Sequence, residues 1–207
     1  MTRLLCLLAA GIVEAQDFAP GRRVLLDAHN CYPEKGRWHD RIDRALALGV
    51  PVAIEQDLLW FGGRSILSHD SKPAGAEPGM KEYFFERVRP IVEDALRRGN
   101  RRLWPLVVLN LDFKSDEPEH HRAVWDLLGE YEPWLTTAVK TDSPSRPGAL
   151  DVKPLLVLTG VSDSQERTFH EAVVPGGRLR VFGAARVRAG TSAASPPDGI
   201  LLEGATN

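Results

Sequence analysis

The feature that most constrains the fold is a buried strand that carries two acidic side chains. The run VAIEQDL at residues 52–58 is mostly apolar, but Glu55 and Asp57 interrupt it two residues apart. Because side chains alternate along a strand, both carboxylates point to the same side. Two such charges repel each other unless a cation or a proton lies between them, and a divalent metal is the usual solution. We therefore expect this strand to border a site.

Strand and helix patterns alternate along the rest of the chain. Apolar runs of strand length are separated by stretches with apolar positions at helical spacing. Continuous apolar strands that alternate with helices are typical of an α/β fold with a parallel sheet. Pro90 is expected to kink or split the helix that contains it. We predict strands at 23–30, 52–58, 106–114, 154–159, 179–182 and 200–202, and helices at 38–48, 83–98, 117–128 and after a capping box of Asp163 and Glu166.

The polar residues of these strands narrow the choice of fold. They lie at or near the C-terminal strand ends, where catalytic residues gather in (β/α)₈ TIM barrels and ligands bind in open sheets. A TIM barrel needs eight strands and about 250 residues. This chain has 207 residues, and we count six barrel strands if the short run at 65–68 is an insertion outside the barrel. We therefore expect an α/β barrel of TIM type that is truncated at the C-terminus, with an open doubly wound sheet as the alternative.

The N-terminus has the pattern of a secretory signal peptide. Arg3 precedes an apolar run at 4–13, which ends in the small-residue cleavage pattern VEA. This run is shorter than the roughly 20 residues that span a bilayer. We expect residues 1–15 to be a signal peptide, 16–207 to form one domain, and the protein to be secreted or periplasmic. A buried first strand or helix is the alternative.

The polar residues at the strand ends form a candidate site. Three carboxylates and one amide oxygen make an oxygen-rich set of the kind that binds Ca²⁺ or Mg²⁺. Two histidines suit general acid–base catalysis, because imidazole titrates near neutral pH. A lysine adds positive charge, and the whole set suits displacement at a phosphodiester. The carboxylates are those of Glu55, Asp57 and Asp112, the amide is that of Asn30, the histidines are His29 and His69, and the lysine is Lys114.

Three short motifs resemble those of a known superfamily. His29-Asn30, Glu55-x-Asp57 and Ser68-His69-Asp70 follow one another as in the phospholipase-C-like phosphodiesterases. This superfamily includes phosphatidylinositol-specific phospholipase C, the glycerophosphodiester phosphodiesterases and the sphingomyelinase D enzymes. The resemblance covers roughly half of the chain, from about residue 26 to 134.

The resemblance implies roles for individual residues. His29 and His69 correspond to the two catalytic histidines, and Glu55 and Asp57 to metal-binding carboxylates. Two departures concern the first and third strands: the His-Arg-Gly start usual in glycerophosphodiesterases is replaced by HNC at 29–31, and Asp112 stands where Glu is common. The resemblance further implies that Asp112 and Asn30 bind the metal, with Lys114 nearby.

We expect a metal-dependent phosphodiesterase that acts on a small-molecule or lipid phosphodiester by internal attack of a neighbouring hydroxyl. A net charge of −2 without a long basic run argues against nucleic acid as a partner. We expect a monomer, and peripheral contact with a membrane stays open. A metal-dependent amidohydrolase is disfavoured, because those enzymes begin with His-x-His where this chain has Asp27-Ala28-His29. A non-catalytic barrel module that binds a phosphorylated ligand or a partner is the remaining alternative.

Several polar residues also have purely structural interpretations. Glu55 and Asp57 could pair with arginines, and Lys114 with Asp112 alone. Trp60 is expected to pack in a loop. We predict solvent-facing positions on helices for the other histidines, His39, His120, His121 and His170.

Overall fold

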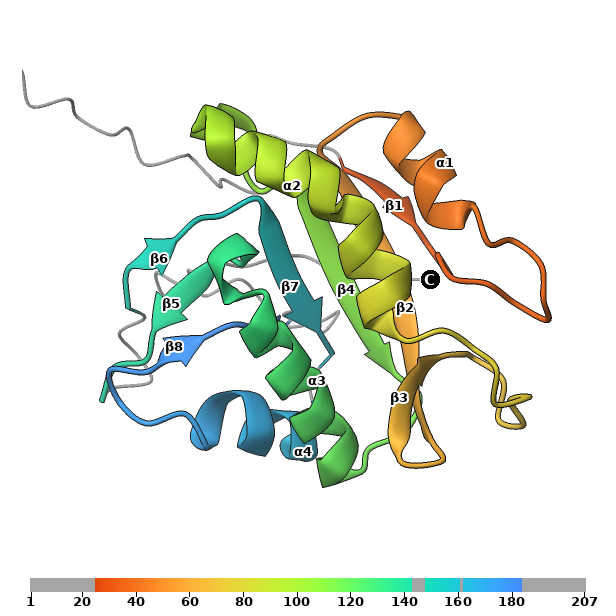
Figure 1. Ribbon diagram of the computed structural model, residues 1–207. Helices are drawn as coiled ribbons and strands as arrows, with labels where there is room; N and C mark the ends of the chain where they lie inside the picture. Colours follow the sequence, from red (N-terminus) through yellow and green to blue (C-terminus); the bar gives the residue numbers. More distant parts are fainter. Residues whose placement is uncertain (1–24, 143–147, 161, 184–207) are drawn as a thin grey trace, which may run out of the picture.

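The computed structural model describes residues 25–142, 148–160 and 162–183, and these are organised around one mostly parallel sheet (Figure 1). The parallel strands pair in the order β1-β2-β4-β7-β9, and the antiparallel β3 pairs with β2. The turn between β2 and β3 contains Gly62 and Gly63, whose φ angles of 58° and 76° favour glycine. The strands of this sheet are β1 (Leu26–Ala28), β2 (Val52–Phe61), β3 (Arg64–Leu67), β4 (Val107–Phe113), β7 (Leu155–Thr159) and β9 (Phe182–Gly183).

The order of the parallel strands bears on the two predicted folds. Each parallel strand pairs with the next one along the chain, as in a barrel. A doubly wound sheet reverses its strand order at a switch point, and the described strands contain no such reversal. The fold is therefore α/β with a sheet that is compatible with a partial barrel. The strand predicted at 200–202 lies outside the described residues.

A second, small antiparallel sheet was not predicted from the sequence. It pairs in the order β6-β5-β8. Its strands are two or three residues long, too short to give a readable alternation of side chains. They are β5 (Thr137–Val139), β6 (Leu150–Asp151) and β8 (Arg178–Leu179).

The helices agree with the predicted pattern except at their ends. Pro90 lies inside α2 without splitting it, and Val88 and Val92 on both sides of it are fully buried in the core. Ser162 caps α4 by accepting the Gln165 N–H, so the cap predicted at Asp163 was wrong by one residue. The helices are α1 (Arg41–Ala47), α2 (Glu86–Arg98), α3 (Pro118–Glu130) and α4 (Asp163–Glu166), with π-helical turns at Lys81–Phe85 and Arg167–Glu171 and 3₁₀ turns at Arg101–Leu103 and Glu132–Trp134.

The two faces of the sheet have different tasks. One face is apolar and packs beneath α2 and α3, which cover it in Figure 1. Ile54 and Leu58 of β2 and Leu109 of β4 contribute to this core and are fully buried. On β2, Glu55 and Asp57 alternate with these apolar side chains, so they lie on the opposite face.

The structure does not test the predicted signal peptide. Residues 1–15 lie outside the described part of the chain. Among the helices that the structure does describe, none combines the length and the apolar character needed to cross a bilayer.

Candidate functional site

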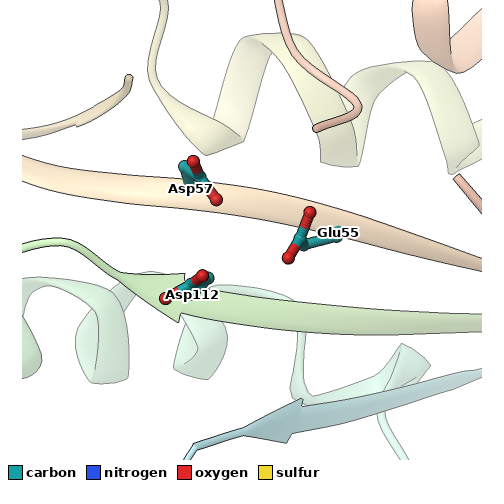
Figure 2. A group of neighbouring side chains, drawn as sticks. All are labelled: Glu55, Asp57 and Asp112. Carbon is teal, nitrogen blue, oxygen red and sulfur yellow. The ribbon is translucent and has the colours of Figure 1, made fainter. Parts of the chain in front are cut away.

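Two neighbouring parallel strands bring three carboxylates together. In the pairing of β2 with β4, Asp57 lies opposite Asp112, and Glu55 lies opposite Asn110. One carboxylate oxygen from each of Glu55, Asp57 and Asp112 lies within 4.8 Å of the others. Figure 2 shows the three side chains converging from the two strands. Asp57 is fully buried and Glu55 is 7% exposed. This buried acidic group could hold a metal ion.

Lys114 only partly neutralises this acidic group. Its Nζ lies 2.7 Å from Asp112 Oδ2 and 3.3 Å from Asp57 Oδ2. Burial alone would lower the pKa of Lys114, but the hydrogen bond to Asp112 and the charge of Asp57 outweigh it and raise that pKa. Burial also raises the pKa of Glu55, and the charges of Asp57 and Asp112 add to the effect. Three carboxylates therefore face one ammonium group, which leaves room for further positive charge.

One carboxylate oxygen of Asp57 indicates that the acidic group suits a cation. Its Oδ1 atom is buried and has no hydrogen-bond partner in the part of the chain that the structure describes. A buried carboxylate oxygen without a partner costs about 1–3 kcal/mol or more, because its water of hydration has been removed. An ion among the three carboxylates would supply the missing partner, and all the available donors are oxygen atoms. The residues therefore fit a metal ion.

His29 and Asn30 reach the acidic group from the end of β1. His29 Nε2 lies 3.3 Å from Glu55 Oε2, and the Asn30 backbone N–H donates to the same oxygen at 2.7 Å. Asn30 has a φ of 51°, in the left-handed region that Asn tolerates better than most residues. Its Nδ2 lies 3.0 Å from His29 Nδ1. The structure thus brings two further predicted residues to the group.

His69 follows a residue that is hydrogen-bonded to Asp57, but its own side chain makes no hydrogen bond to the acidic group. The backbone N–H of the preceding residue, Ser68, donates to the Asp57 carbonyl at 3.1 Å, so His69 follows directly on the strand that borders Asp57. Its side chain is exposed, and it forms no hydrogen bond or ion pair with the described residues. The structure therefore leaves this imidazole accessible from solvent.

Tyr32 belongs to the site, although it was not predicted from the sequence. Its side chain is 3% exposed, and its hydroxyl lies 2.7 Å from Asp57 Oδ2 and 2.9 Å from Asn30 Oδ1. Burial raises the pKa of this hydroxyl, and the hydrogen bond to Asp57 raises it further, so the group is a donor at neutral pH. The sequence offered one signal: an aromatic residue with a polar tip, two positions after the strand-end Asn30.

The prediction of solvent-facing positions for His120 and His121 was wrong. Both side chains are fully buried on the inner side of α3. His120 and His121 lie four and three residues before Val124, on the same helix face, and this spacing could have revealed their burial. Burial lowers the pKa of His120 to about 4 and lowers the pKa of His121 as well.

Three other surface predictions had different outcomes. His39 is exposed as predicted, although it precedes α1 and does not lie on it. His170 is partly buried in a π-helical turn. Trp60 lies in β2 and not in a loop, and its ring stacks on His120 with the ring centres 5.6 Å apart.

The assembled residues can bind a cation, place a positive ammonium group beside it and offer an accessible imidazole. The side chain of His29 is 61% exposed, so a substrate can reach its ring. Comparison of the chain with known protein families, with curated proteins and with solved structures found no match.

Proposed function

We propose that this protein is a metal-dependent phosphodiesterase that cleaves a glycerophosphodiester or a phospholipid headgroup. The observation that carries the proposal is the convergence of three carboxylates, Lys114 and His29 on one face of adjacent parallel strands. Sequential parallel strands with polar ends also suit the barrel on which such sites are built. We further propose that the protein is exported and acts as a monomer.

The metal site would be Ca²⁺- or Mg²⁺-binding, with oxygen ligands from both strands. Glu55, Asp57 and Asp112 would hold the ion, with the Asn30 amide oxygen as a further ligand. Both cations prefer such hard oxygen donors. When bound, the ion would stabilise negative charge on the phosphoryl oxygens. Lys114 would support the same charge, because its ammonium group already lies beside two of the carboxylates.

The two histidines would move the protons of the reaction. One imidazole takes the proton from a substrate hydroxyl, which attacks the neighbouring phosphorus and forms a new P–O bond. The other imidazole gives a proton to the leaving alcohol as the original P–O bond breaks. His29 and His69 are both exposed, as groups that meet a substrate must be. The product would be a cyclic phosphate, which is released or hydrolysed.

The test measures cleavage of glycerophosphodiesters, which carry a hydroxyl group near the phosphorus, by the full chain with and without EDTA. We expect activity that EDTA removes and that Ca²⁺ or Mg²⁺ restores. Activity that is indifferent to EDTA would contradict the metal-dependent mechanism. Inactivity on a broad panel of diesters, combined with binding of a phosphorylated ligand, would favour a non-catalytic barrel module.

A further inference from the structure

Two donors from separate parts of the chain hold the same oxygen of Asp57. The Tyr32 hydroxyl lies 2.7 Å from Oδ2, and Lys114 Nζ lies 3.3 Å from it. The other oxygen, Oδ1, is buried and has no hydrogen-bond partner among residues 25–142, 148–160 and 162–183. Both protein donors therefore act on one side of this carboxylate. This arrangement fixes the rotation of the Asp57 carboxylate and leaves Oδ1 able to accept a further ligand.

The Tyr32 hydroxyl has more acceptors than protons. It lies within hydrogen-bond distance of Asp57 Oδ2 and of Asn30 Oδ1, at 2.7 and 2.9 Å, but it carries a single proton. A charged acceptor forms the stronger hydrogen bond, so the proton belongs to Asp57. Within the described residues, Asn30 Oδ1 then has no other donor. Both Asp57 and Asn30 thus keep an oxygen that an added cation would satisfy.

We infer that Tyr32 is a positioning residue that orients the Asp57 carboxylate, and with it the Asn30 amide, for binding of a divalent cation. This inference rests on the proposed function, because it concerns the same metal site. Polar groups that hold metal ligands in place typically contribute 10- to 100-fold to metal affinity. Tyr32 would act in this way through its hydroxyl alone, without contacting the ion.

The loop that carries Tyr32 is itself fixed in place. The Tyr32 ring is buried in the core, and Arg41 Nη1 donates to the backbone carbonyls of Asn30 at 2.7 Å and of Tyr32 at 3.0 Å. Arg41 lies at the start of α1, so this helix holds both residues beside the end of β2. A hydroxyl on such a pinned loop can set the direction of a carboxylate, whereas one on a loose loop could not.

The experiment measures Ca²⁺ and Mg²⁺ binding to the full chain by titration calorimetry, with the metal alone as the probe. We compare the wild type with Tyr32→Phe, which removes only the hydroxyl. Tyr83→Phe is the matched control, because Tyr83 is also 3% exposed but its hydroxyl lies 3.4 Å from the Trp38 carbonyl, away from the carboxylates. We expect Kd to rise about 10- to 100-fold in Tyr32→Phe and to stay unchanged in Tyr83→Phe.

Unfolding midpoints without metal separate positioning from mere packing. A purely structural role would lower the midpoint of Tyr32→Phe and leave Kd unchanged, and this result would overturn the inference while the proposed function stood. A wild-type protein that binds neither cation would instead overturn the proposed function. If Tyr32→Phe does not fold, Arg41→Lys decides, because it loosens the loop from outside the core. A raised Kd in that variant supports the inference, and an unchanged Kd contradicts it.

Discussion

His29 and the pair His120–His121 differ in their exposure and in the charge around them. His29 lies at the edge of the carboxylate group, largely exposed, with Glu55 Oε2 and Asn30 Nδ2 as its polar neighbours. His120 and His121 lie inside α3, fully buried. The surroundings of His29 leave negative charge unmatched. The rings of His120 and His121 are hydrogen-bonded within the described residues except at His121 Nε2.

The buried cluster joins separate elements of the fold. The His120 ring nitrogens lie 2.8 Å from Ser65 Oγ on β3 and 3.0 Å from Ser115 Oγ after β4. Ser115 Oγ also accepts the Trp60 N–H at 2.9 Å, and the Trp60 ring stacks on His120. His120 therefore ties the β2–β3 hairpin to the start of α3. Its lowered pKa follows from this structural task, because only the neutral ring is cheap to bury.

The comparison teaches that a perturbed histidine is not by itself a sign of catalysis. The lowered pKa of His120 belongs to a buried structural ring, whereas the accessible His29 lies beside the carboxylate of Glu55. The charge balance distinguishes the candidate site better, since three carboxylates there face one lysine, whereas a buried atom without a hydrogen-bond partner among the described residues also occurs in the buried cluster, at His121 Nε2.

The largest expected effect separates His29 from the buried cluster by activity. We expect His29→Ala and His69→Ala each to lower kcat/KM for diester hydrolysis by about 10²- to 10⁴-fold, because each removes a proton-transfer group. His120→Gln should leave kcat/KM close to that of the wild type. Steady-state kinetics on the purified variants measures this. Equal losses in all three variants would show that the buried cluster also serves the reaction.

The next effect concerns the unmatched charge of the carboxylates. A cation that binds only the folded state at 100 times its Kd raises the free energy of unfolding by about 2.7 kcal/mol. We expect Ca²⁺ or Mg²⁺ to do so in the wild type and Asp112→Asn to lose most of this gain. Urea unfolding with and without metal measures it. Asp126→Asn, on the exposed side of α3, is the matched control and should keep the full gain.

A pH experiment probes the buried cluster. The pKa of His120 is about 4 in the folded protein and near its ordinary 6.5 in the unfolded chain. Between these values the unfolded chain binds more protons, so stability is complete above about pH 6.5 and falls as the pH approaches 4. From pH 7 to pH 5 the loss should be about 2 kcal/mol. Urea unfolding at the two pH values should show a smaller loss in His120→Gln, and identical losses would contradict this account.

The smallest expected effect tests whether Ser65 belongs to the buried network. Ser65→Ala removes one hydrogen-bond partner of His120 and should lower the free energy of unfolding by about 1–2 kcal/mol at neutral pH. Thermal or urea unfolding would measure this loss, with diester hydrolysis unaffected. His39→Ala, at an exposed ring, should change stability by no more than about 0.5 kcal/mol. If the Ser65 variant had the same free energy of unfolding as the His39 variant, the hydrogen bond of Ser65 to His120 would contribute nothing to stability.

Much of the fold could be predicted because it follows from local pattern. The continuous apolar runs around Glu55 and Asp112 identified β2 and β4, and Pro118 marked the first turn of α3. The alternation on these strands also placed the acidic side chains on one face, since the period of a strand is fixed at two residues. The parallel pairing then followed from the alternation of strands with helices.

The sequence by itself thus determined β2 and β4, their parallel direction and the acidic face, but not the small sheet of β5, β6 and β8. Tertiary structure alone decided the register that sets Asp57 opposite Asp112, the contact of Tyr32 with Asp57, and the contact of His120 with Ser65. These contacts join residues 25 to 55 positions apart in the chain, so no local period encodes them. Periodicity fixes which way a side chain points, whereas only the packed fold fixes what it meets.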